Sequence, residues 1–519
     1  MKFDAVIVGS GAGGAAMAWR LSRAGMSVGV LEQGTWFTGA DLSQEGWELE
    51  GHHRLSPVPS VRMGEFDMKV DSSSSDIEVS FFQAVGGSTN IYSGHFPRFR
   101  PEDFNRQSKL GVGADWPIEY ADLRPFYETN EIRMKVAGRV GDPSFPDLHS
   151  LGKEVPVGEI GNKMSGAFKK LGWHCWVSYG AFDTQVGSDS VCKNLGPCNL
   201  GCPIGAKMTA KNGYLDEAVR NGIEVLPKSS ASELILKNGY ISEVRVRKPE
   251  GQEFSVKADI FILAAGALGT AKLLLASNEA NHRGLSNGSG QVGKNLMVHP
   301  LGLAEGLFEG ASDVSLGPKG SWMYSLEFGD FLSATEPGFM LQMLRGIDLV
   351  NVGRRAFRTN KLGPNLPTPE TLQPGKHSVG IAVVVEDLPN ESNRVDLDYS
   401  TRDAFDLPGL RVTYKVDESV RKALIKGLNS SRKVLQEMGA QSTQGIGPVR
   451  GAGWHPSGTA RMGNNPNSSV VDGRGRSHEI PNLYICDSSV FPTGSCLNPT
   501  NTIQAVSLFV AEGIVNGSK

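Results

Sequence analysis

Four residues near the start of the chain have the types and spacing needed to hold a dinucleotide. They form the pattern Gly9-x-Gly11-x-x-Gly14, with Glu32 following 18 positions after the last glycine. The first glycine allows a tight turn, the second lets a pyrophosphate approach the backbone, and the third lets a helix pack closely on a strand. The carboxylate can bind the ribose hydroxyls of the adenosine half. Glycine turns alone are common, so the prediction depends on the elements around them, and the motif does not distinguish FAD from NAD.

Those elements follow directly from the sequence on either side of the turn. Residues 3–8 are mostly apolar and predict a short buried strand, residues 15–24 predict a helix, and residues 28–31 predict a second strand that ends at the acid. A helix that begins at the turn directs its free N–H groups and positive dipole end at a phosphate. The region is therefore expected to start an α/β, Rossmann-like domain.

Three cysteines form a second group that could do chemistry. Cys192, Cys198 and Cys202 are separated by five and three residues. Clustered cysteines outside a disulfide scaffold often bind metal, and thiolates select iron–sulfur clusters or zinc. Three thiolates suit a 3Fe–4S cluster, with one for each iron, whereas zinc needs a fourth ligand that only Cys175 or His174 could supply. An iron-free turn with free thiols or a disulfide stays open as the alternative.

The composition limits the class of protein. The chain has 519 residues with 39% hydrophobic residues, which is enough for a large core. Lys and Arg total 52 against 55 for Asp and Glu, so a net charge of -3 gives no reason to expect a nucleic-acid partner. No apolar run is long enough to predict a transmembrane segment. The sequence also starts without a charged leader and apolar signal core, which favours a cytoplasmic location.

Segments far from the first motif are expected to join the same domain. A glycine-rich stretch lies at residues 85–90, and apolar strands are predicted at residues 259–263 and 482–487. A nucleotide-binding fold that recruits a strand so late is discontinuous, and this arrangement favours an extended FAD over NAD. We expect the FAD-binding domain to comprise residues 1–40, 78–105, 190–300 and 450–519.

Taken together and in order, six segments resemble the glucose-methanol-choline (GMC) oxidoreductase family. The resemblance is closest to its bacterial sugar/gluconate dehydrogenase and pyranose-oxidase-like branch, and it extends over nearly the whole chain. The matching segments are residues 9–14 with Glu32, residues 86–90, 266–274 and 292–300, the sequence His455-Pro456-Ser457-Gly458-Thr459, and the sequence Asn498-Pro499-Thr500.

The resemblance implies oxidation of an alcohol by hydride transfer from its carbinol carbon to flavin N5. It places the family's paired active-site residues at His455 and Asn498. Histidine suits the role of the base because its ordinary pKa is close to working pH. Asparagine cannot titrate, but it can hydrogen-bond the substrate oxygen. His299 also lies in a family segment, and we predict a structural role or a place near the cofactor for it.

The resemblance also identifies residues for cofactor binding. Backbone N–H groups of the glycine-rich segment are expected to contact the isoalloxazine or pyrophosphate. Related sugar oxidases carry a histidine, covalently linked to the flavin, where this chain has an asparagine, so FAD is expected to be non-covalent. The expected contacts of this segment are Gly87, Ser88, Thr89 and Asn90, and further expected contacts are Ala265, Asp487, Pro499 and Thr500.

The rest of the chain is expected to form a substrate or cap domain of residues 41–77, 106–189 and 301–449. Residues 377–386 and 409–414 predict strands, and residues 418–438 predict a long amphipathic helix. Relatives use this region as an antiparallel sheet, covered by helices, that roofs the flavin.

The substrate implied by the branch is a small alcohol, and more specifically a sugar or polyol. The cysteine spacing is similar to that of dehydrogenases that pass electrons through a 3Fe–4S cluster to a cytochrome. Such enzymes work with a cytochrome or a small companion subunit, and some are exported to the periplasm with that companion. Without the cluster, oxygen or a quinone becomes the expected acceptor. The alternative function is a non-redox lyase, similar to hydroxynitrile lyases, on the same FAD scaffold.

Overall fold

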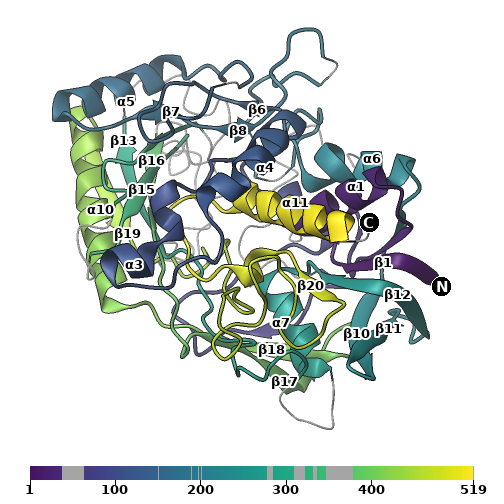
Figure 1. Ribbon diagram of the computed structural model, residues 1–519. Helices are drawn as coiled ribbons and strands as arrows, with labels where there is room; N and C mark the ends of the chain where they lie inside the picture. The colour runs from purple at the N-terminus through teal and green to yellow at the C-terminus, as the bar shows by residue number, and fades with distance from the viewer. Residues whose placement is uncertain are drawn as a thin grey trace, which may run out of the picture.

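The computed structural model contains two large β-sheets, one on each side of the view in Figure 1, with helices packed on them. The structure describes residues 1–37, 64–149, 151–188, 190–196, 198–199, 201–277, 284–308, 322–330, 336–345 and 378–517. Most of the predicted segment 41–77 and part of the predicted segment 301–449 lie outside the described residues. None of the helices in the described ranges has the length and apolarity needed to cross a bilayer.

The first sheet has a parallel centre built from distant parts of the chain. Its order is β20 (Leu483–Ile485), β12 (Glu253–Leu263), β1 (Lys2–Val8), β2 (Val28–Leu31) and β9 (Glu224–Leu226), all parallel. Residues 5–8 of β1 are apolar and buried, as expected for a strand covered on both faces. The carboxyl ends of β1 and β2 lead into the glycine turn and Glu32.

An antiparallel hairpin extends this sheet at one edge. Strands β10 (Ser230–Lys237) and β11 (Tyr240–Arg247) pair with each other, and β11 pairs with the first half of β12. The second half of β12 instead pairs with β1 and β20. Helix α7 (Gly266–Ala276) follows β12 directly.

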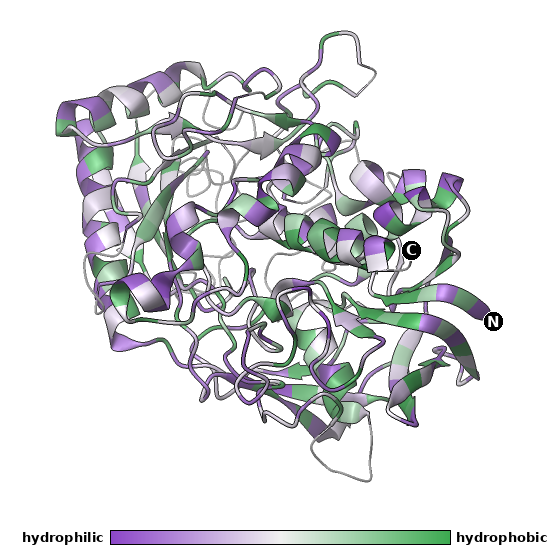
Figure 2. Ribbon diagram, viewed as in Figure 1, coloured by the Kyte–Doolittle hydropathy of each residue, from purple (hydrophilic) through white to green (hydrophobic). Residues whose placement is uncertain are grey.

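Helices cover the outer face of the parallel centre. Helix α1 (Ala12–Arg23) packs against α11 (Thr500–Gly517), and α11 packs against α4 (Tyr120–Arg133). Most of α11 is buried, and Figure 2 shows it as largely apolar. Gly13 lets the start of α1 approach the residue that follows β20, because a Cβ there would lie 2.4 Å from the Cys486 carbonyl oxygen.

The second sheet is antiparallel, and one of its faces lines the space between the two sheets. Its order is β19 (Ser442–Ile446), β13 (Leu301–Leu307), β16 (Ser378–Val385), β15 (Phe339–Leu344), β14 (Met323–Ser325) and β7 (Trp176–Val177). Helix α10 (Glu418–Glu437) covers its outer face and packs against α5 (Gly158–Leu171) (Figure 1). The apolar face of α10 is thus buried on β13 and β16, and the other face of the sheet is left for the space between the two sheets.

The predicted fold class is confirmed: an α/β fold combines a discontinuous Rossmann-like part with an antiparallel sheet covered by helices. The strands of the first sheet fall within the predicted segments 1–40, 190–300 and 450–519, although the exact division into domains stays a prediction. The remaining strands and α-helices of the described residues are β3 (Thr35–Trp36), β4 (Val70–Asp71), β5 (Ala84–Val85), β6 (Val136–Ala137), β8 (Gly180–Ala181), β17 (Arg394–Arg402), β18 (Pro408–Thr413), α3 (Arg106–Leu110) and α6 (Asp216–Arg220).

Candidate active site

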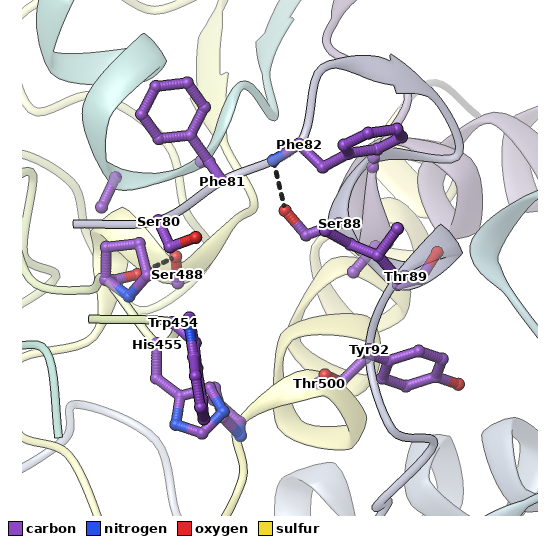
Figure 3. A pocket seen from close by; sticks show the side chains of 18 of the residues that line it. Ser80, Phe81, Phe82, Ser88, Thr89, Tyr92, Trp454, His455, Ser488 and Thr500 are labelled. Carbon is purple, nitrogen blue, oxygen red and sulfur yellow. Dashed lines mark hydrogen bonds between the residues drawn. The ribbon is translucent and has the colours of Figure 1, made fainter. Parts of the chain in front are cut away.

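A cavity of about 650 Å³ lies between the two sheets. One wall comes from the turns at the carboxyl ends of the parallel strands, and the other from side chains of β13, β15 and β16. Figure 3 shows part of it, with His455 and Trp454 on one side and Ser88 and Thr89 on the other. Ligands of open α/β sheets bind at this end of the strands.

Each of the three glycines of the first motif is needed for a different structural reason. Gly9 has φ +100°, and a Cβ on it would lie 2.4 Å from the Ala264 carbonyl oxygen. A Cβ on Gly14 would lie 1.9 Å from the carbonyl oxygen of Gly9, so helix and turn could not pack. A Cβ on Gly11 would meet only the Cα of Gly87, at 3.9 Å, and would otherwise point into open space. Gly11 therefore leaves the backbone accessible from the cavity.

The start of α1 is suited to hold a phosphate. Its N-cap residue, Gly11, provides no side-chain hydrogen bond, and its first turn has no acidic residue. The first backbone N–H groups of a helix lack intrahelical partners. Because residues 11–13 line the cavity, these donors are available to an anionic group there.

Glu32 lies at the end of β2 and lines the same cavity. It accepts hydrogen bonds from the hydroxyl of Ser10 at 2.5 Å and from the backbone N–H of Gly34 at 2.8 Å. Burial raises the pKa of this carboxyl, and these hydrogen bonds oppose the rise. The contact with Ser10 fixes the carboxylate close to the glycine turn, and the sequence motif had not indicated it.

The second glycine-rich segment forms a short turn at residues 87–90. Gly87, Ser88 and Thr89 line the cavity, and Ser88 accepts a hydrogen bond from the Phe82 N–H at 3.0 Å (Figure 3). Asn90 differs from the expectation. It is not among the lining residues, and its amide nitrogen donates to the carbonyl oxygens of Val85 and Gly87 at 3.1 and 3.0 Å. Its side chain thus stabilises the turn by hydrogen-bonding to the backbone.

The four other predicted contacts, Ala265, Asp487, Pro499 and Thr500, all line the cavity. Asp487 accepts hydrogen bonds from the Gly266 N–H at 2.9 Å and the Thr270 hydroxyl at 2.6 Å, so it caps the start of α7. An open helix start, an acid at the second strand and an accessible glycine backbone are the features that an extended dinucleotide requires. The residues present therefore fit FAD.

His455 and Asn498 come together at the wall of this cavity. Asn498 Nδ2 lies 3.2 Å from His455 Nε2, although the two residues are 43 positions apart. His455 Nδ1 lies 3.1 Å from His299 Nδ1 on its other side. His299 is thus next to the expected base rather than remote from it.

The electrostatic surroundings keep this group of histidines neutral. Burial, followed by the neighbouring His299 and His95, lowers the pKa of His455 well below its ordinary value. Burial lowers the pKa of His299 to about 4, and nearby Asp103 opposes that shift. A neutral imidazole has one nitrogen free to accept a proton, which is the state that a general base needs.

His95 is a further residue of the site that the sequence analysis missed. It lines the cavity, is 1% exposed, and its Nδ1 lies 2.6 Å from Asn498 Oδ1. The only local signal was its position beside the family-like segment 96–104. The aromatic residues Trp322, Tyr324 and Phe339 are buried in the core and do not line the cavity.

The three clustered cysteines carry free thiols and line a second, much smaller cavity of about 20 Å³. Burial raises the pKa of Cys198 to about 12, with Lys207 opposing that shift. Within the described part of the chain, no group of three or more His, Cys, Asp or Glu side chains is arranged to hold a metal ion. As they are placed, Cys192, Cys198 and Cys202 do not form a cluster site.

Comparisons with known proteins agree with this geometry. Residues 3–301 match the N-terminal model of the GMC oxidoreductase family, and residues 389–507 match its C-terminal model. The chain belongs to the GMC oxidoreductase family.

Similar proteins include both enzymes and solved structures. This GMC oxidoreductase is 32% identical to 2-methyl-1,2-propanediol dehydrogenase of Mycolicibacterium austroafricanum, over 97% of this chain and 94% of that protein. It is 29% identical to the fructose dehydrogenase large subunit of Gluconobacter japonicus, over 100% and 99% of the two chains. The crystal structure of pyridoxine 4-oxidase from Mesorbium loti shares the fold, with a TM-score of 0.67, 18% identity and 98% coverage of each chain. The protein is an FAD-dependent alcohol or sugar oxidoreductase.

The glycines of the first motif provide a test of where FAD lies. In the Gly11→Ala variant the added methyl group would enter the cavity, so we expect FAD affinity to fall about tenfold to a hundredfold, as for overpacked sites. The apoprotein should keep its thermal stability. Gly14→Ala places a methyl group against backbone, so little soluble protein is expected. Flavin content after gel filtration and thermal unfolding would distinguish the two variants, and unchanged affinity in Gly11→Ala would contradict this placement.

Proposed function

We propose that this GMC oxidoreductase oxidises one hydroxyl group of a small polyol or sugar, with His455 as the base. The observation that carries the proposal is the contact between His455 and Asn498 at the cavity wall. One residue can accept a proton there, and the other can hold the oxygen from which it comes.

The chain's own residues account for the proton and for the orientation of the substrate. His455 Nε2 accepts the hydroxyl proton, and the amide N–H of Asn498 donates to the substrate oxygen and retains it beside the imidazole. His455 stays neutral until the substrate arrives because burial disfavours its charged form. FAD, when bound, takes up the hydride that leaves the carbinol carbon.

The polyol or sugar class is supported by the relatives, whose names specify a propanediol and fructose. The polar groups Glu305, Gln342 and Arg345 on the facing sheet also line the cavity. Several donors and acceptors in one cavity suit a substrate with more than one hydroxyl group.

Anaerobic mixing with a panel of diols, polyols, sugars and simple alcohols tests the proposal. A polyol or sugar should bleach the flavin absorbance faster than a monohydric alcohol of the same length. A protein that cleaves a cyanohydrin without bleaching its flavin would be the lyase instead. Flavin that bleaches with none of these compounds would refute the proposed reaction.

The pH dependence of the reaction follows from the low pKa of His455. Because the folded-state pKa lies below the ordinary 6.5 of histidine, the base form persists below that pH and is lost as pH falls through the lowered value. We expect the acid limb of kcat/KM for flavin reduction to have an apparent pKa below 6.5. The measurement is stopped-flow reduction across pH, with flavin fluorescence to check that FAD stays bound. An acid limb above 6.5 would contradict the assignment.

We propose a 3Fe–4S cluster at Cys192, Cys198 and Cys202 from their spacing, with a cytochrome as the electron acceptor or a small companion subunit as the partner. Their free thiols line one cavity, and one relative is named as a large subunit. The proposal requires the three side chains to rearrange, because in the described part of the chain they do not form a group that could hold a metal ion. We expect about three iron and four sulfide ions per flavin in anaerobically purified protein, and loss of both in Cys198→Ser. Iron-free protein would contradict the cluster.

Acid precipitation should release the flavin, as expected for non-covalent FAD.

A further inference from the structure

His95 contacts the amide group of Asn498 on the side opposite to His455. Its backbone forms an isolated β-bridge with Gly180, and its ring lies 6.0 Å from that of Tyr324. The side chain is 1% exposed, so its position is determined by the surrounding packing. Within the described part of the chain, its side chain makes one hydrogen bond, which joins Nδ1 to Asn498 Oδ1 at 2.6 Å. The family assignment gives this residue no role.

The chemistry of the amide determines which atoms carry protons. Asn498 Oδ1 can only accept, so His95 Nδ1 must donate to it. Asn498 Nδ2 can only donate, so His455 Nε2 must accept from it. A neutral His455 then carries its proton on Nδ1 and donates it to His299 Nδ1. The direction of each hydrogen bond thus depends on the donor at His95.

A role in packing alone does not explain a histidine at this position. Among the residues that the structure describes, His95 Nε2 is buried and has no hydrogen-bond partner. A buried acceptor without a partner is unfavourable, and an aromatic hydrocarbon side chain of similar size would avoid this cost. What the histidine adds is the single N–H that contacts Asn498. If the carboxamide rotated by half a turn, its oxygen would face His455 Nε2, and that nitrogen would have to be protonated to make a hydrogen bond.

We infer that His95 is a positioning residue for the proposed reaction: its Nδ1–H fixes the carboxamide of Asn498 so that Nδ2 faces His455 and Nε2 of His455 stays unprotonated. This inference rests on the proposed function, because it concerns the base of that reaction. His95 itself does not exchange a proton with the substrate. It acts through Asn498, and through it on the protonation of His455.

Two amide substitutions separate this role from packing. In His95→Asn the amide nitrogen can occupy about the place of Nδ1, whereas in His95→Gln it reaches about the place of Nε2. We expect the limiting rate of anaerobic flavin reduction to fall about tenfold to a hundredfold in His95→Gln and His95→Phe. The rate should recover to within about threefold of the wild type in His95→Asn, with KM and flavin content little changed. Equal losses in the Asn and Gln variants, or a full rate in the Phe variant, would overturn the inference.

A double-mutant comparison tests the same contact through its partner. If His95 acts through the amide, His95→Gln should have no further effect once Asn498 has been replaced by alanine. Additive losses would contradict the inference. Wild-type flavin that no alcohol bleaches would instead show that the proposed function itself is wrong.

Asn498→Asp, which keeps the size of the side chain, supports a second measurement if the His95 variants do not fold. A carboxylate would present an oxygen to His455 Nε2, which would then bind a proton more readily. The acid limb of flavin reduction should therefore move to higher pH. The other titratable groups around His455 are His299 and His95, and both are retained in this variant. An unmoved acid limb would contradict control of His455 by the amide.

Discussion

Flavin reduction is expected to slow by about a hundredfold or more in the His455→Ala variant, while FAD stays bound. The imidazole is partly buried at the cavity wall, and its Nε2 lies 3.2 Å from the amide nitrogen that would share the substrate oxygen. Removal of a positioned general base typically costs a factor of about 10² to 10⁴. Stopped-flow mixing under anaerobic conditions measures the reduction rate directly, without the step in which an acceptor reoxidises the flavin.

The control for this prediction is His149→Ala, which removes an exposed histidine from the surface. That variant should reduce its flavin at the wild-type rate. Equal flavin content in the wild type, His455→Ala and His149→Ala would exclude a loss of cofactor as the cause of slower flavin reduction. If His455→Ala reduced its flavin as fast as the wild type, His455 would not be the base, and the proposed mechanism would fail.

Arg106→Ala is expected to lower the free energy of unfolding by about 3–5 kcal/mol, as for a buried ion pair that loses one partner. Arg106 Nη2 lies 2.8 Å from Glu386 Oε2 and 2.6 Å from Asp103 Oδ1. The three side chains are 0–3% exposed, so neither carboxyl group could turn to water in the variant. Burial already raises the pKa of Glu386 to about 8 although Arg106 opposes the shift.

A second arginine offers a matched comparison on the surface. Arg139 also makes a bidentate contact, with both Glu154 oxygens at 2.6 Å, but these side chains are 50% and 31% exposed. Arg139→Ala should cost about 1 kcal/mol or less because water replaces the lost partner. Equilibrium denaturation with flavin fluorescence and circular dichroism would compare the two variants. Similar costs for both would show that the buried cluster adds no specific stability.

The cofactor-binding part of the fold could be predicted from short-range patterns. An apolar strand, a glycine turn and a helix follow one another within about 25 residues, and steric demands at Gly9 and Gly14 allow few other residues. The late strand β20 could be predicted as well, because it is apolar and Asp487 follows it closely. Its pairing with β12 was not predicted and comes from the structure.

Contacts between side chains from distant segments could not be predicted in this way. His95 and Asn498 are 403 positions apart, and nothing in the sequence around His95 indicates an amide partner. Arg106 and Glu386 are separated by 280 positions and pair only because both are buried between α3 and the end of β16. Such contacts depend on packing that no periodic pattern records.

The direction of a side chain in a turn could not be predicted from the sequence either. Asn90 follows Thr89 directly, but the short helical turn points its amide toward the backbone of residues 85 and 87 rather than toward the cavity. The cysteine spacing predicted three thiols in one place, and the structure does bring them to one small cavity. Spacing along the chain could not fix the distances between the sulfur atoms.

The pairing of β12 with β20 also determines when this enzyme can first become active during its synthesis. Residues 261–263 cannot pair on this side until residues 483–485 have been synthesised. One edge of the parallel sheet therefore stays open while about 220 further residues leave the ribosome. An open apolar edge is prone to associate with other nascent chains, and chaperones shield such surfaces. The imidazole, the carboxamide and helix α11 emerge in the same late stretch. A prematurely terminated polypeptide therefore lacks its proton acceptor as well as its last strand, and it cannot consume substrate.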